Sequence, residues 1–469
     1  MRRRKGHKIF DTRWIWYFCA VMIYIIVVNL PLPEFTAPGQ HCLAVFAVAA
    51  FLWITNLFPI AVTGIIVLFL LPMSGSISPS TTYSYFGNSA VFFVLGAFIL
   101  ASPVMRSGLS TRIAITIISK FGKGPKRLLL SIFMLSSFLA FIISEHAVAA
   151  MLFPIIMEIV KAAEAPKNSK FAFAAFMAMA WGAMVGGTAT LLGGARAPLA
   201  IGMLQADTDK TISFVEWTMW TLPAVLIILS ICFCVLLFII RGHVFNIDLA
   251  REKLLLHKGK LGKLSRRELY TILILVFTIT LWIMYGNEWG LDWIALLGVI
   301  LAFALRITSW REVEEDVKWG IFIMYGSAIA LSAALRDTGA AHSIVQILLN
   351  AGIDSPLVIF IVLASTAIIL TEIMSNAAAV AVLLPIGLAL GAEYGIDPRA
   401  IAIGIATCAG LTFVLPVSTP AMALVTSCSY VNRKKAISWG IFLKIIAFAV
   451  FMGMVLIYWP MVGLSVINN

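Results

Sequence analysis

A single arginine interrupts an apolar run that is otherwise long enough to cross a bilayer. Arg196 lies within residues 171–203, and the run around it reads GGTATLLGGARAP from Gly186 to Pro198. A cation near the middle of a bilayer costs about 2.5–3.5 kcal/mol on insertion scales. The glycines and the proline predict a broken helix, which survives at membrane depth only where protein or a wet cavity satisfies its backbone. Arg196 is therefore a candidate anion site, and a structural pair with a buried carboxylate is the alternative.

The composition places the whole chain in a membrane. Of the 469 residues, 61% are hydrophobic and only 12% are charged, and the mean hydropathy is +1.00. The net charge of +12 comes from Lys and Arg in short segments between apolar runs, which argues against a nucleic-acid-binding face. The six cysteines lie in or beside apolar segments, so they indicate neither disulfides nor a metal site.

Four basic clusters predict the orientation of the chain, at residues 2–13, 105–127, 241–267 and 433–435. By the positive-inside rule all four face the cytoplasm, so the N-terminus is predicted to be cytoplasmic. All four clusters fall on the same side of the membrane if the chain crosses it eleven times. The predicted spans lie near 14–31, 41–57, 59–73, 88–105, 171–204, 217–240, 269–286, 291–306, 318–335, 399–428 and 435–459. Two further apolar stretches, 126–164 and 355–393, carry polar breaks and are predicted to be re-entrant hairpins.

The second half of the chain repeats the first. Residues 96–106 resemble residues 326–336, and residues 144–155 resemble residues 375–386. Five spans separate the two hairpins, so the two repeats have opposite orientations in the membrane. Inverted repeats with paired broken segments indicate a secondary transporter whose site lies near the bilayer midplane.

The predicted fold is therefore an all-α polytopic membrane protein of two inverted repeats, with re-entrant hairpins, broken helices and about eleven spans. Its predicted parts are an N-terminal span at 1–40, a first repeat at 41–245, a basic cytoplasmic linker at 246–268 and a second repeat at 269–469. The broken spans are 171–204 and 399–428.

This order of motifs resembles the divalent anion/sodium symporter family, the solute carrier thirteen-like transporters. The likeness is carried by residues 56–75, 106–109, 370–376 with 385–386, and 415–420. It implies a multi-pass protein of a prokaryotic inner (plasma) membrane with a small anionic substrate and no enzymatic activity. It also implies a homodimer in which each protomer moves a transport domain past a scaffold, like an elevator.

In that family each hairpin tip carries Ser-Asn-Thr, and each broken span carries a sequence close to Gly-Thr-Pro-Pro-Asn. These segments bind substrate carboxylates and two sodium ions. The second half of this chain is nearly standard, but the first half has Glu145 and His146 at the tip and Arg196 in the facing loop. The resemblance and the residue chemistry together predict substrate contacts from Ser144, Glu145, His146, Gly194, Arg196, Ser375, Asn376, Ala377, Thr419 and Pro420.

The first-half substitutions change the expected coupling. Arg196 would repel sodium and take its electrostatic place, and its fork geometry suits a carboxylate, phosphate or sulfonate. Glu145 and His146 are candidate proton carriers. Their structural alternatives are a buried Glu145–Arg196 pair and a neutral His146 donor. A weaker sodium set is Ser375, Asn376, Ser418 and Thr419, and no other cofactor is predicted.

The resulting functional prediction is a transporter of di- or monocarboxylate-like anions that works by sodium-independent exchange or by proton coupling. A cation/proton antiporter of the same superfamily and an inorganic oxyanion or sulfonate transporter are the alternatives. A membrane enzyme is disfavoured because only His146, of six histidines, is clearly intramembrane. A channel is disfavoured because paired re-entrant hairpins suit alternating access.

Overall fold

The computed structural model describes residues 13–122, 124–167, 169–242, 247–349, 355–416 and 418–466. Within these ranges all regular structure is helical, and the prediction of an all-α polytopic membrane protein is confirmed. Several apolar helices expose large apolar side chains, among them Phe69, Ile300 and Ile457, as lipid-facing helices do. The basic cluster at residues 2–8 lies outside the described residues.

Nine uninterrupted helices correspond to nine of the predicted spans within the described part of the chain. Their boundaries agree closely with the predicted ones, and the largest difference is at α2, which begins at Ala37 where residue 41 was predicted. These helices are α1 (Arg13–Asn29), α2 (Ala37–Thr55), α3 (Ile60–Met73), α5 (Ser89–Arg106), α11 (Phe214–Ile239), α13 (Arg266–Trp289), α14 (Leu291–Ala304), α16 (Trp319–Asp337) and α22 (Arg433–Met461).

The other two spans are broken, as predicted. In the first repeat α9 (Lys170–Gly186) is separated from α10 (Arg196–Thr208) by an irregular loop. In the second repeat α20 (Pro398–Gly410) is separated from α21 (Pro420–Ser427) in the same way. Every residue of α9 from Phe171 to Gly186 is buried. A helix that is apolar on all sides and rich in alanine suits such a central position, because small side chains allow neighbouring backbones to approach.

Each repeat also contains a helical hairpin. The first is α7 (Pro125–Ala140) with α8 (Glu145–Ala162), and the second is α18 (Pro356–Ile373) with α19 (Asn376–Glu393). Both arms of the first hairpin pack on α9, and both arms of the second pack on α20. The same packing in both halves supports the internal repeat found in the sequence.

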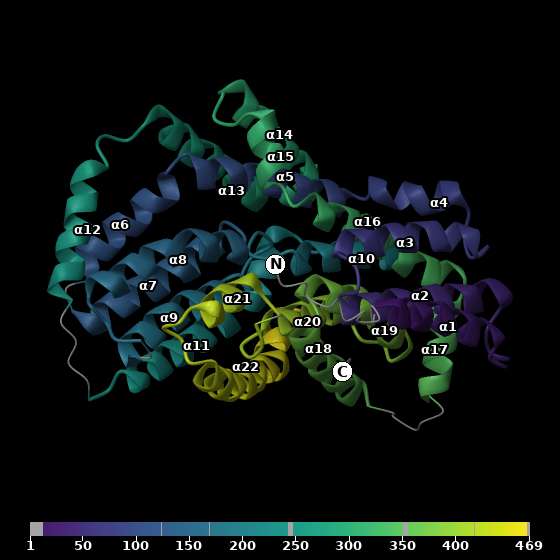
Figure 1. The fold of residues 1–469 in the computed structure, drawn as a ribbon. Coiled ribbons are helices and arrows are strands. Elements are labelled where there is room, and N and C mark those ends of the chain that lie inside the picture. Colours follow the sequence, from purple (N-terminus) through teal and green to yellow (C-terminus); the bar gives the residue numbers. More distant parts are fainter. Residues whose placement is uncertain are drawn as a thin grey trace, which may run out of the picture.

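Short helices that were not predicted connect these elements. They are α4 (Pro79–Ser84), η1 (Tyr85–Gly87), α6 (Leu109–Phe121), α12 (Asp248–Lys260), α15 (Trp310–Asp316) and α17 (Ala340–Leu349). Figure 1 shows α6 and α12 together at one end of the molecule, and α4 and α17 at the opposite end. They were missed because they are too short or too polar to resemble membrane spans.

Polar contacts between distant loops agree with the predicted sides. On the predicted cytoplasmic side, Arg106 pairs with Asp316 at 2.7 Å and Arg112 pairs with Glu268 at 2.6 Å. On the predicted outer side, the Tyr85 hydroxyl donates to Asp337. Each of these contacts joins segments that the positive-inside rule places on one side of the membrane.

Candidate anion-binding site

The first broken span is held open by the tip of the first hairpin. The Glu145 backbone N–H donates to the Gly193 carbonyl at 2.9 Å, and the Thr190 hydroxyl donates to the Phe141 carbonyl at 2.7 Å. Glycine is required at residue 193, because a Cβ there would collide with the Gly187 backbone. These bonds satisfy part of the backbone that the helix break frees.

A buried ion pair joins the hairpin tip to the broken span. Arg196 Nη1 lies 3.3 Å from Glu145 Oε2, and the two side chains are only 2% and 1% exposed. The guanidinium also lies against Gly410 at the carboxyl end of α20, where a Cβ would collide with it. Arg196 therefore connects the first hairpin with the broken spans of both repeats.

Each partner of this pair keeps one buried polar atom without a hydrogen bond in the structure. These atoms are Glu145 Oε1 and Arg196 Nη2. His146 Nδ1 lies 3.7 Å from Glu145 Oε1, which is beyond a normal hydrogen bond. Unsatisfied buried polar atoms are costly, so they often mark the place of a water, an ion or a substrate group.

The corresponding groups in the second half are bonded internally. The Thr371 hydroxyl lies 2.7 Å from the Ala409 carbonyl and 2.8 Å from Asn376 Oδ1. The Thr419 hydroxyl donates to the sulfur of Met184 at 3.3 Å. Met184 comes from α9 of the other repeat, so its sulfur position could not be read from the second-half motif.

A second buried carboxylate supports the second broken span. Glu372 accepts hydrogen bonds from the backbone N–H groups of Leu415, at 2.7 Å, and Val414, at 3.3 Å. Its Oε1 also accepts from Lys444 Nζ at 2.7 Å. Sequence reasoning missed Lys444, because α22 brings it to the site from 72 residues further along the chain.

Three of the predicted site residues begin helices that point at the site. Ser144 caps α8, Ser375 caps α19 and Thr419 caps α21, each through a side-chain oxygen that accepts a backbone N–H. Pro420 is the first residue of α21. The positive ends of these helices favour negative charge nearby, which suits an anion.

A water-sized cavity of about 20 Å³ lies between the first hairpin tip, the first broken span and α5. Ser144 and Gly194 contribute to its wall, whereas Glu145, His146 and Arg196 do not. Its lining residues are Val94, Ala97, Phe98, Ala101, Ile142, Ile143, Ser144, Leu191, Leu192, Gly194, Ala195 and Pro198.

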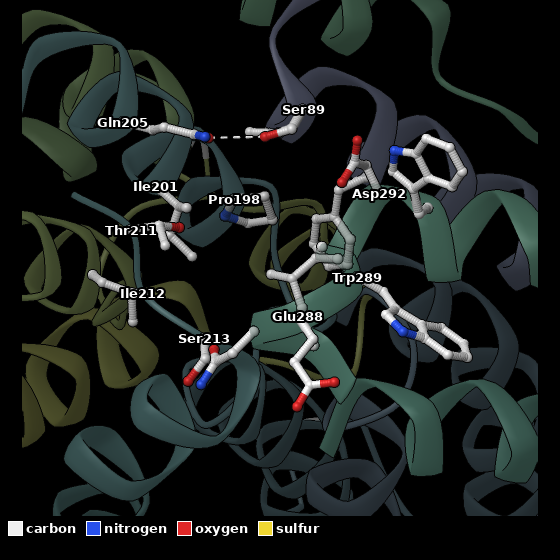
Figure 2. A pocket seen from close by; sticks show the side chains of 17 residues that line it. Ser89, Pro198, Ile201, Gln205, Thr211, Ile212, Ser213, Glu288, Trp289 and Asp292 are labelled. Atoms are coloured by element: carbon white, nitrogen blue, oxygen red, sulfur yellow. Dashed lines mark hydrogen bonds between the residues drawn. The ribbon is translucent and has the colours of Figure 1, made fainter. Parts of the chain in front are cut away.

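A larger cavity of about 350 Å³ opens on the predicted outer side (Figure 2). It lies between α5, the outer part of α10 and the turn that joins α13 to α14. Ser89 donates to Gln205 at 2.8 Å across this cavity, and Glu288 and Asp292 contribute acidic groups to its wall. Pro198 lines both cavities, so they follow one another along the seam between α5 and α10.

Residues 11–465 match the family model of the sodium:sulfate symporter transmembrane region. The chain belongs to this family. The relationship predicted from the sequence motifs is thereby confirmed, and the protein is a multi-pass membrane transporter and not an enzyme. The match covers both repeats, so the first-half site with Glu145 and Arg196 lies inside the matched region.

Two similar curated proteins are both named sodium-dependent dicarboxylate transporter SdcS. The one from Staphylococcus saprophyticus is 29% identical over an alignment of 481 positions, which covers 95% of this chain and 91% of that protein. The one from Staphylococcus aureus strain bovine RF122 is 29% identical and covers 87% of this chain and 84% of that protein.

Two solved transporters share the fold. The structure of Neisseria gonorrhoeae MtrF, from a class of antimetabolite efflux pumps, has a TM-score of 0.57 and 17% identity over 81% of this chain and 84% of that one. The Alcanivorax borkumensis YdaH transporter has a TM-score of 0.56 and 13% identity over 82% of this chain and 88% of that one. At these identities the likeness shows a common architecture alone.

Proposed function

We propose that the protein is a secondary active transporter of small dicarboxylate-type anions that uses Arg196 in place of one sodium ion. The substrate class is supported by the name of the two staphylococcal relatives and by the three helix N-termini at the site. The observation that carries the proposal is the buried Glu145–Arg196 pair between the first hairpin and both broken spans.

Arg196 acts as a tethered cation in this proposal. Its guanidinium lies at the carboxyl end of α20, which is the negative end of the helix dipole. A sodium ion would need that same negative environment and would be repelled by the fixed charge. One of the two sodium ions expected for the family is therefore replaced by a side chain.

The residues of the second half form a poor sodium site, so they would not replace the sodium site that Arg196 removes from the first half. Thr419 and Thr412 both direct their hydroxyl groups at the Met184 sulfur, at 3.3 and 3.8 Å. Sodium is a hard cation that prefers a cage of oxygen atoms, and a thioether contributes little to its binding. We therefore expect at most weak sodium dependence, in contrast to the name of the relatives.

Two coupling modes are compatible with this site. Anion exchange needs no cation, because substrate moves in both directions. Proton symport would use Glu145, whose Oε1 atom lacks a hydrogen bond in the structure, with His146 at 3.7 Å. The same free oxygen supports the second candidate function, a cation/proton antiporter in which Arg196 is only structural.

The seam between α5 and α10 is the proposed path of the substrate. The tip cavity is too small for a dicarboxylate, so we infer that the hairpin and the broken span move relative to α5 during transport. We propose an elevator in which the two hairpins and the two broken spans form the moving domain. We also propose a homodimer, with the N-terminus of each protomer in the cytoplasm.

Uptake by reconstituted protein tests this proposal. Proteoliposomes would be preloaded with succinate, sulfate or no anion. Uptake of labelled succinate, labelled sulfate and labelled sodium would be measured with external sodium, with choline, and with a proton gradient. We expect uptake in choline that depends either on internal anion or on the proton gradient. Uptake of sulfate but not of succinate would favour the oxyanion alternative. Proton-driven cation movement without anion uptake would favour the antiporter.

A further inference from the structure

The buried pair leaves the hairpin tip without a net positive charge. Arg196 contributes one positive charge and Glu145 removes it, since the two groups lie 3.3 Å apart. A dianionic substrate would then find helix dipoles but no unpaired cation at the tip. A further positive group near the tip would be needed for preferential binding of a dianion over a monoanion.

The structure brings one such group to the tip from another part of the chain. Asp316, at the end of α15, accepts a hydrogen bond from Ser102 of α5 at 2.6 Å. Val317 is buried in a cluster with Ile99, and Phe98 packs against this cluster. Phe98 also lines the tip cavity, so the segment that precedes α16 is fixed beside the α5 face that borders this cavity.

Lys318 is the next residue. Its ammonium group lies within Coulombic range of both Glu145 and His146 at the hairpin tip. Its side chain is exposed, and no hydrogen bond or ion pair joins it to another described residue. The neighbouring basic residue Arg106, in contrast, forms ion pairs with Asp316 and Glu315.

We propose that Lys318 is a specificity-determining residue that attracts dianionic substrate to the hairpin tip from the cytoplasmic side. This inference rests on the proposed anion transport and adds a residue to that site. Lys318 precedes α16, whose first residues are on the predicted cytoplasmic side, whereas the tip belongs to the proposed moving domain. The charge therefore acts on the substrate only while the tip faces the cytoplasm.

The test compares Lys318→Gln with Lys318→Arg and with Arg311→Gln in vesicles of known orientation. Arg311 is a matched control, because it lies in the adjacent α15 and its side chain is 89% exposed. The readouts are the KM values for succinate and for a monocarboxylate on each side, at low and at high salt. For Lys318→Gln we expect the cytoplasmic KM for succinate to rise about fivefold to tenfold at low salt, and less at high salt.

Three further results are expected if the inference is right. Lys318→Arg keeps the wild-type KM, Arg311→Gln changes nothing, and the outer KM stays the same in every variant. An unchanged cytoplasmic KM for succinate in Lys318→Gln, with normal wild-type transport, would overturn this inference alone. Absence of anion uptake by the wild type would overturn both this inference and the proposed function.

Discussion

The two halves of the molecule each bury a carboxylate beside a broken span, but they bond it differently. In the second half, Glu372 accepts two backbone N–H bonds and pairs with Lys444 at 2.7 Å. In the first half, Glu145 pairs with Arg196 at 3.3 Å, and each partner keeps one buried atom without a hydrogen bond. A fully bonded group stabilises a loop, whereas a partly bonded one retains capacity for a ligand or a proton.

This difference separates an architectural pair from a functional one. The hydrogen bonds of Glu372 account for its presence without any substrate. In the first pair, Glu145 Oε1 and Arg196 Nη2 are buried without a hydrogen bond, and burying polar atoms in this way costs free energy. We infer that the first half has become the specialised site of this transporter, and that the second half supports it.

The largest expected effect comes from removing one partner of the first pair. Arg196→Met leaves Glu145 buried without a counterion, which should cost about 3–5 kcal/mol of stability and abolish transport. Lys444→Met leaves Glu372 with both of its backbone donors, so the loss should be smaller, roughly 1–3 kcal/mol. Thermal unfolding in detergent and uptake in proteoliposomes measure both. Normal folding and transport by Arg196→Met would show that Arg196 is not part of the site.

Neutralising both members of each pair should sharpen the contrast. The double variant Glu145→Gln/Arg196→Met removes the unpaired buried charge, so its stability should recover by about 1–4 kcal/mol over Arg196→Met, while transport stays lost. The double variant Glu372→Gln/Lys444→Met should keep transport. If the first double variant transports normally, the first pair is as architectural as the second.

A smaller effect is expected when charge is kept and geometry is changed. Arg196→Lys retains a cation but cannot bond Glu145 and a substrate carboxylate with one planar fork. We expect succinate to bind about tenfold more weakly, with little change in thermal stability. The matched change Lys444→Arg should leave succinate affinity unaltered. Equal affinities for wild type and Arg196→Lys would mean that only the charge of residue 196 matters.

The inverted arrangement of the halves can be tested without changing activity. Asp209 follows the first broken span and Asn432 follows the second, so the two residues should lie on opposite sides of the membrane. Single cysteines at these positions, in a Cys234→Ser background because Cys234 is exposed, can be labelled with an impermeant thiol reagent. Labelling of both from the same side would contradict the inverted topology.

Much of this architecture could be predicted from the sequence, because long apolar runs mark the membrane-spanning helices. The break around Arg196 and its closeness to Glu145 followed from glycine, proline and the repeated order of motifs. Lys444 and Met184 could not be predicted as neighbours of the second broken span. Lys444 comes from α22 and Met184 from α9 of the first repeat, and only tertiary packing decides which of their neighbours they meet.

The connecting helices escaped prediction for a different physical reason. α12 is rich in charged residues and α6 is short and amphipathic, so no long apolar run marks either helix, although they pack on each other. Their positions become predictable only when the ends of the neighbouring spans are known. The same holds for the cavities, which lie between elements and have no sequence signature of their own.

The most direct test of the replacement of sodium by Arg196 is the sodium dependence of succinate uptake. Initial rates would be measured in proteoliposomes at constant ionic strength, with sodium replaced stepwise by choline. We expect uptake to persist without sodium, and any sodium stimulation to show a Hill coefficient of about one or less. Uptake that vanishes in choline and rises steeply, with more than one sodium ion per cycle, would contradict the replacement.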